Sequence, residues 1–300
     1  MEDEMRSYLD CFGCFMDQGL DVARRSGADE AQQRLILNEI AGMFPSFDLE
    51  TRPPVMSLKI NRTIRDMTGV FDPYADEKKR CNELALKAVG LVRSNIAAAS
   101  DSLTRAMEYA IAGNSIDFGA NHHLDIDETL ADLISGEESK LASQSGSTFM
   151  LEAFRKELSK ARSLLFISDN AGEIVFDMLL IEAIAALYPD ISITVAVRDE
   201  PIINDATLED AKTIGLNNVC EVISSGSPAP GTPLDLCSDE FLERFFSSDM
   251  VVAKGQGNYE TLNDAPRMIY LLFRVKCRVI SHHCGGAMGD IMLIPSQSID

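Results

Sequence analysis

The spacing of hydrophobic residues changes near the middle of the chain. Up to about residue 134 they recur every three or four positions, as in residues 31–43, 82–94 and 101–112, which is the spacing of one helix face. Beyond residue 163, short apolar or β-branched runs alternate with helix-type segments. The pattern predicts a helical first half and a second half of alternating strands and helices.

The second half predicts a mainly parallel sheet, because helical segments separate its strands. The expected strands are residues 164–168, 191–197, 220–224, 249–253 and 268–275, and the expected helices are residues 154–161, 173–187, 207–214 and 239–246. The polar segment 136–150 has no sustained period and is typical of a boundary loop. We therefore expect two domains, residues 1–148 and residues 149–300.

The first of these strands ends at an acidic turn. Asp169 and Asn170 follow it, and Ala171-Gly172 leads into Glu173 and a long apolar helix. Ligands of parallel sheets bind at the carboxyl ends of strands. A carboxylate beside a carboxamide offers the oxygen ligands that Mg²⁺ and Mn²⁺ prefer, and the opening helix offers N–H groups to phosphate. Taken alone, Asp169 is better explained as a helix N-cap.

Other strands of the predicted sheet also end in polar clusters. These are Arg198/Asp199, Lys254/Asn258/Glu260 and Lys276. Parallel strands bring their carboxyl ends to one edge, where acids can hold a divalent metal and lysines can bind phosphate. Loops at strand ends are usually polar in any case, but that explains the repeated mixture of acid, amide and lysine poorly. The sequence favours one convergent site.

Amino-acid composition and net charge limit which binding partners and which cellular compartment are expected. The chain has 300 residues and a net charge of −20, which argues against nucleic acid and anionic membranes. Its first residues lack the pattern of a signal peptide, and no apolar stretch reaches the length of a membrane span. Seven scattered cysteines are typical of reduced thiols. We expect a cytoplasmic protein.

Several smaller motifs have ordinary explanations. Cys11 and Cys14 form a CxxC, but no second CxxC completes a zinc site and the pair falls in an expected helix. His122-His123, the turn at residues 113–119 and the loop expected at His282-His283-Cys284 also need no ligand. The fragment Gly255-Gln256-Gly257 lacks the third glycine of a dinucleotide fingerprint.

Taken together and in order, the motifs resemble the metal-dependent damage-control phosphatases, in particular the stand-alone prokaryotic branch with an early CxxC. The matching segments span nearly the whole chain: Cys11 to Cys14, Thr51-Arg52-Pro53-Pro54, Asp72-Pro73-Tyr74, Ala112 to Asp117, Asp169 to Glu173, Asn204-Asp205-Ala206-Thr207, Lys254 to Glu260, and Lys276-Cys277.

The resemblance implies an all-helical N-terminal domain packed on a Rossmann-like α/β/α domain. It implies a divalent metal, Mn²⁺, Co²⁺, Ni²⁺ or Mg²⁺, held by Asp169, Asn170 and Asp205. The expected reaction is hydrolysis of phosphomonoesters of small metabolites, such as sugar phosphates or damaged phospho-metabolites. Asn114 and Asp117 become expected contributors to the active site from the helical half.

We expect the site residues to have different roles. Asp169, Asn170 and Asp205 would hold the metal, while Lys254 and Lys276 would bind phosphoryl oxygens. The remaining polar residues would position the substrate or the attacking water: Asn258, Glu260, Asn114 and Asp117, with Glu173 as a supporting partner or a helix acid. Attack by water is favoured over a phosphoaspartate. Asp205→Ala is expected to abolish metal-dependent turnover and leave the fold intact.

Two other classes of function stay open at this point. One is a methyltransferase that uses S-adenosylmethionine, although Asp169-Asn170-Ala171-Gly172 is a poor version of its Gly-rich turn. The other is a metabolite-binding protein without catalysis. The expected partner is a small phosphorylated metabolite, with neither nucleic acid nor membrane, and homo-oligomer formation is left open.

Overall fold

The structure is a computed structural model that describes residues 5–113 and 148–296. Its centre is a six-stranded sheet in the order β3-β2-β1-β4-β5-β6, parallel except for the antiparallel pair of β5 and β6. The strands are β1 (Ser163–Ile167), β2 (Ser192–Val197), β3 (Glu221–Ser224), β4 (Met250–Lys254), β5 (Tyr270–Arg274) and β6 (Ile291–Pro295). The mixed α/β architecture with a mainly parallel sheet confirms the predicted fold class.

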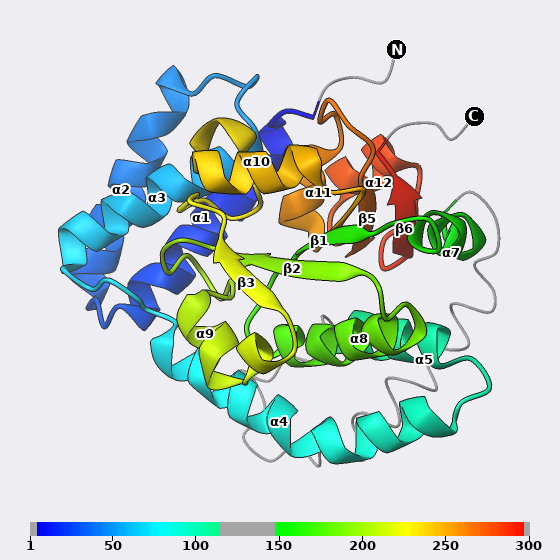
Figure 1. Cartoon of the computed structure of the whole chain (residues 1–300). Helices are drawn as coiled ribbons and strands as arrows, with labels where there is room; N and C mark the ends of the chain where they lie inside the picture. The colour runs from blue at the N-terminus through cyan, green and yellow to red at the C-terminus, as the bar shows by residue number, and fades with distance from the viewer. Residues whose placement is uncertain (1–4, 114–147, 297–300) are drawn as a thin grey trace.

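Helices cover both faces of the sheet (Figure 1). One face packs on α4 (Ala75–Ala98), α5 (Ser102–Gly113), α7 (Leu151–Leu158), α8 (Glu173–Leu187) and α9 (Leu208–Thr213); the other packs on α10 (Asp239–Ser247), α11 (Gln256–Leu262) and α12 (Arg278–Cys284). Alternate strand residues serve the two faces. Leu164 and Phe166 of β1 join the core with α8, whereas Leu165 and Ile167 face α10.

The first three helices form a unit with its own core at one side of the sheet (Figure 1). They are α1 (Leu9–Arg25), α2 (Glu30–Met43) and α3 (Pro53–Thr68), and their core includes Phe15, Ile40 and Ile60. Two arginines of this part of the chain reach the α/β half. Arg52 forms a bidentate ion pair with Asp264, 2.6 and 2.7 Å, and Arg65 pairs with Glu200 at 3.0 Å.

Helix boundaries follow local capping. Asp29 accepts a hydrogen bond from Gln32 N at the start of α2, and Asp101 accepts one from Thr104 N at the start of α5. Helix α3 ends at Gly69, whose φ of 72° is readily adopted by glycine. In the described residues, no helix is both long enough and apolar enough to cross a membrane.

Most predicted elements are present, and three were missed. The residues predicted as a polar loop after Lys254 form α11, and His282-His283-Cys284 lie in α12, so the loop prediction there was wrong. The antiparallel β6 was also missed. Helices α4 and α5 belong to the same core as α8 and the sheet, so the sheet packs against part of the helical half. The division at residues 148 and 149 stays a prediction.

Candidate active site

Backbone hydrogen bonds bring the ends of β1 and β2 together. The N–H of Ala206 donates to the carbonyl of Asp169 at 2.8 Å, and the N–H of Ala171 donates to the carbonyl of Asn204 at 2.9 Å. Asn170 and Asp205 are therefore bridged in antiparallel fashion beyond the ends of the two parallel strands. The acidic turn after β1 and the acidic loop after β2 form one surface.

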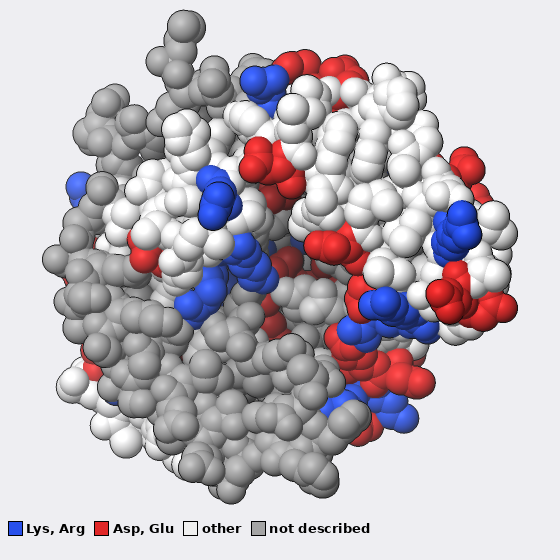
Figure 2. Space-filling view, turned by 180° about the vertical axis from the view of Figure 1, so that it is seen from behind, with Lys and Arg blue, Asp and Glu red and all other residues white. Residues whose placement is uncertain are grey.

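This surface is the floor of a pocket of about 550 Å³. Five of the predicted site residues line the pocket: Asp169, Asn170, Asp205, Glu260 and Lys276. Helices α1 and α3 supply the opposite wall. Seen from behind, the molecule is hollowed near its centre, with acidic side chains visible inside the hollow and basic side chains beside it (Figure 2).

The carboxyl groups on the floor of the pocket repel one another when they are ionised. Burial and the neighbouring charges of Asp205 and Glu173 raise the pKa of Asp169 to about 8, against the opposing charges of Lys276 and Arg198. Burial also raises the pKa of Asp205, although Arg198 opposes the rise. Acids gathered in this way are suited to a cation that neutralises them.

Whether the residues fit a metal ion depends on the donor set. In the parts of the chain that are described, no group of three or more His, Cys, Asp and Glu side chains is arranged to hold one. The predicted set instead has two carboxylates and the amide of Asn170, which are hard oxygen donors. Because burial and mutual repulsion make an ionised Asp169 unfavourable, a divalent cation at this point would stabilise its charged form. By donor chemistry and electrostatics the residues fit.

Asn170 is held by a chain of buried groups behind the pocket. Its Nδ2 donates to Glu173 Oε2 at 3.1 Å and to Asp169 Oδ2 at 2.8 Å. Lys254 Nζ donates to Glu173 Oε1 at 2.6 Å, to Asp177 Oδ1 at 2.7 Å and to the carbonyl of Ala110 at 3.0 Å. The bonds from Asn170 Nδ2 fix the orientation of its amide group.

Lys254 therefore differs from its predicted place, whereas Glu173 lies in the first turn of α8 and contacts Asn170, as expected of a supporting partner. Both side chains are about 1–2% exposed, and neither lines the pocket. All three N–H groups of the Lys254 ammonium are engaged, and although burial alone would lower its pKa, Asp177 and Glu173 raise it above its usual value. The predicted contact between Lys254 and phosphate is replaced by a positioning role.

Arg198 was expected near the site as part of a polar strand end, but no role was predicted for it. It is 1% exposed, and its Nε donates to Asp205 Oδ2 at 2.7 Å. Its other nitrogens donate to Thr232 Oγ1 at 2.8 Å and to Asn258 Oδ1 at 3.2 Å. Asp205→Ala would leave this guanidinium buried without its carboxylate, so we now expect that variant to lose stability as well as activity.

Asn258 is buried below the pocket instead of lining it. Its side chain is 0% exposed, and its Nδ2 donates to the carbonyls of Ser168 at 3.1 Å and Lys254 at 2.6 Å. Together with the Arg198 bond, these contacts join the ends of β1, β2 and β4. Asn258 was predicted to bind substrate. Its contacts instead hold the ends of the three strands together.

Glu260 and Lys276 form the other side of the floor. Gln256 joins them, because its Nε2 donates to Glu260 Oε1 at 2.9 Å and its Oε1 accepts from the backbone N–H of Lys276 at 2.9 Å. Burial raises the pKa of Glu260 to about 7, against the bond from Gln256 and the charge of Lys276. The side chain of Lys276 is exposed to the pocket and lowers the pKa of Asp169 as well.

Gly255 lies directly beneath Asp169. Its φ is 87°, and a Cβ atom there would lie 2.0 Å from Asp169 Oδ2. Only glycine at this position, directly after β4, leaves room for the carboxylate of Asp169. Asn114 and Asp117, which were predicted to complete the site, lie outside the described residues, as do His122 and His123.

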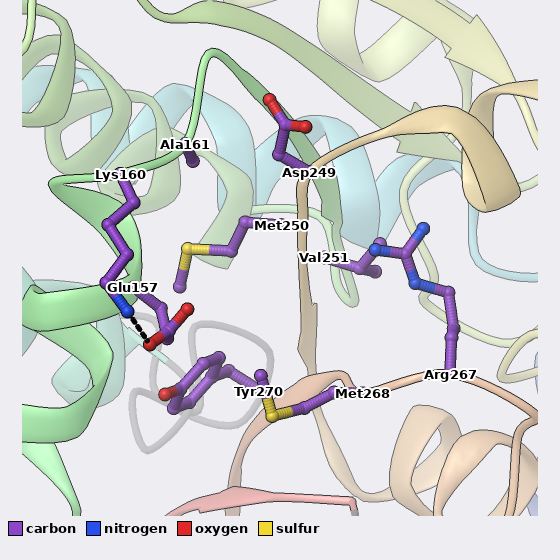
Figure 3. Close-up of a pocket in the computed structure, with 9 residues that line it drawn as sticks. All are labelled: Glu157, Lys160, Ala161, Asp249, Met250, Val251, Arg267, Met268 and Tyr270. Atoms are coloured by element: carbon purple, nitrogen blue, oxygen red, sulfur yellow. Dashed lines mark hydrogen bonds and ion pairs between the residues drawn. The ribbon is translucent and has the colours of Figure 1, made fainter.

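A second pocket, of about 220 Å³, lies at the opposite edge of the sheet, near the first residues of β4 and β5 (Figure 3). Lys160 is paired there with Glu157 at 2.7 Å, and Arg267 donates to the backbone carbonyls of Phe245 and Ser248. None of the predicted site residues lines this pocket. The site at the carboxyl ends of the strands is thus the better candidate, as expected for a parallel sheet.

Fold and pocket define an α/β protein with an acidic ligand site at the carboxyl edge of its sheet. The family model described as the damage-control phosphatase ARMT1-like domain matches residues 7–292, and the chain belongs to this family. A damage-control phosphatase of Archaeoglobus fulgidus is 33% identical over 239 residues, which cover 79% of this chain and 80% of the relative.

Two further comparisons agree. A damage-control phosphatase of Pyrococcus horikoshii is 29% identical over 300 residues, which cover 98% of this chain and 99% of the relative. The crystal structure of this same Pyrococcus protein, described as a DUF89 family protein, aligns with a TM-score of 0.89 and 27% identity, over 98% of this chain and 100% of that one. The predicted family is confirmed, and phosphatase is the class of activity that it supports.

Proposed function

We propose that this chain is a metal-dependent hydrolase of phosphomonoesters of small metabolites. The observation that supports the proposal is the gathering of Asp169, Asn170, Asp205 and Lys276 around one pocket in a member of a phosphatase family. The family and its named relatives favour this function over methyl transfer and over ligand binding without catalysis.

Each residue of the floor has a role in the proposal. Asp169, Asn170 and Asp205 hold the cation, which, when bound, neutralises charge on the phosphoryl group. Lys276 binds phosphoryl oxygens through its ammonium. Glu260, with a pKa of about 7, is suited to protonate the leaving oxygen at neutral pH. Lys254, Glu173 and Arg198 position the cation ligands from behind.

The direct test measures phosphate release from a panel of phosphomonoesters with Mg²⁺, Mn²⁺, Co²⁺ or Ni²⁺, and with chelator. We expect release only with metal, and a fall of about 100-fold in kcat/KM for Lys276→Gln, as when one charge-stabilising donor is removed. Lys212→Gln, at an exposed position on α9, is the matched control and should behave as the parent protein. Release that chelator leaves unchanged would contradict metal dependence, and no release with any metal would contradict the phosphatase assignment.

Gly255→Ala is expected to lower kcat/KM by about 100-fold, because its Cβ would displace the carboxylate of Asp169. Gly289→Ala is a close control, since Gly289 has the same φ of 87° and no atom within 4 Å of the added Cβ. Both variants carry the backbone cost of an alanine at positive φ, and at Gly255 the ψ of 158° adds to it, because essentially only glycine adopts that combination. Steady-state kinetics on the two variants separate displacement from backbone strain, and equal activity losses would refute the close contact.

A further inference from the structure

The wall opposite the charged floor is mostly apolar. Six apolar side chains from different segments line the pocket, four of them from the N-terminal segment, α1 and α3, and two beside the floor: Met5, Phe15, Pro53 and Pro54, then Ile203 and Val279. Phe15 is 4% exposed and packs in the core of α1–α3, so this wall is a fixed part of the fold. An apolar wall of this kind favours a ligand whose contacting part is also apolar. Water then leaves both surfaces, and no polar group of the ligand loses its hydrogen bonds.

The polar groups on the same wall offer little to a polyhydroxylated ligand. Ser57 donates its hydroxyl hydrogen to Gln18 Oε1 at 2.8 Å, so these two side chains already satisfy one another in part. Cys11 and Cys14 line the wall as well, and burial raises the pKa of both thiols, which keeps them neutral. Hydroxyl groups of a sugar placed here would lose water without gaining matching partners.

Charge limits the ligand in a second way. The pocket is lined by four carboxylates and two basic side chains: Asp10, Asp169, Asp205 and Glu260 against Lys276 and Arg278. One divalent cation would offset part of this acidic charge, and one phosphate would then face the cation, Lys276 and Arg278. Each additional negative group on the substrate would enter an acidic pocket in a chain whose net charge is −20, and among the described residues that line the pocket no further basic side chain could receive it.

We propose that the substrates are monophosphate esters whose leaving group is uncharged and largely apolar, with the phosphate on the floor and the apolar body against α1, α3 and α12. This inference rests on the proposed function for the place of the phosphate. It predicts that aliphatic and aromatic monophosphates are better substrates than sugar phosphates, and that monophosphates are better substrates than bisphosphates.

Binding tests the inference without hydrolysis. Alkylphosphonates from methyl to hexyl are titrated by calorimetry into the protein with Mn²⁺, and the alkyl phosphates are assayed in parallel for phosphate release. Affinity and kcat/KM should each rise about two- to fourfold per methylene, up to the factor for one fully buried CH₂. Hexane-1,6-diyl bisphosphate should be a poorer substrate than hexyl phosphate by at least tenfold, and glucose 6-phosphate likewise.

Val279→Thr adds a hydroxyl group to the apolar lining of the pocket with little change of shape. It should weaken hexylphosphonate binding about threefold and leave methylphosphonate binding unchanged. Val219→Thr, at a similarly half-buried valine outside the pocket, should change neither. A flat alkyl series, or glucose 6-phosphate equal to hexyl phosphate, would overturn the inference while phosphate release still supported the phosphatase. Tight hexylphosphonate binding without release from any ester would uphold the apolar wall and refute the phosphatase.

Discussion

Asp169→Asn should abolish phosphate release and, in the presence of chelator, raise the free energy of unfolding above pH 8 by several kcal/mol, because each unit of raised pKa corresponds to about 1.4 kcal/mol. Burial and the charges of Asp205 and Glu173 raise the pKa of Asp169 to about 8 in the folded protein. A carboxyl with a raised folded pKa favours folding below its unfolded pKa, near 4, and that contribution is lost as the pH rises to about 8. Asparagine removes the loss because it carries no charge.

Denaturant titrations of the parent and variant between pH 4 and pH 9 measure this difference. The two curves should converge at pH 4 and separate as the pH rises, and Mn²⁺ should stabilise the parent more than the variant. Asp190→Asn, at an exposed turn before β2, should change neither stability nor activity. A variant that keeps activity would remove Asp169 from the site, and one that is less stable than the parent at pH 9 would refute the electrostatic description.

Lys254→Met should lower the free energy of unfolding by about 4 kcal/mol at pH 8. The change leaves Glu173 and Asp177 buried without their common counter-charge, and burial already raises the pKa of Asp177 to about 7. Without the ammonium, the folded pKa of Asp177 would be higher still. The loss of stability should be smallest near pH 4 and should grow as the pH rises through that value.

Two comparisons isolate the charge effect in Lys254→Met. Lys160→Met breaks an exposed pair with Glu157 and should cost less than about 1 kcal/mol. Adding Glu173→Gln and Asp177→Asn to Lys254→Met should recover most of the lost stability, because no buried charge is left. Activity should stay low in the triple variant, since the amide of Asn170 loses the carboxylate that orients it. A triple variant as unstable as Lys254→Met would show that shape, and not charge, is responsible.

The sequence predicted the elements whose pattern is strong. Strand β1, helix α8 and the acidic turn between them were all placed, because an apolar run, a turn and a long apolar helix are local signals. Helix α11 was missed because Gly255 and Gly257 suggest a loop, and only packing of Tyr259 and Leu262 against the sheet makes the segment helical. Tertiary contacts overrode local preference there.

Side-chain direction explains the misplaced lysine. Val252 faces the core with α8 and Ala253 faces the opposite core, so strand alternation directs Lys254 toward α8 and away from the pocket. That signal was present in the sequence but was outweighed by the polar cluster that Lys254 begins. Arg198 was predicted only as part of a polar strand end. Its partners Asp205 and Thr232 lie in separate loops and Asn258 lies in α11, and only the folded chain brings them around one guanidinium.

The floor and the wall of the pocket are built by parts of the chain with separate hydrophobic cores. The floor lies on loops of the sheet, whereas the wall includes α1 and α3, whose core of Phe15, Ile40 and Ile60 is their own. Substitutions on the inner sides of those two helices can change which leaving groups are accepted while the groups that act on the phosphate stay as they are. We therefore expect that grafting a different helical unit onto the same sheet would change the substrate selectivity of the protein.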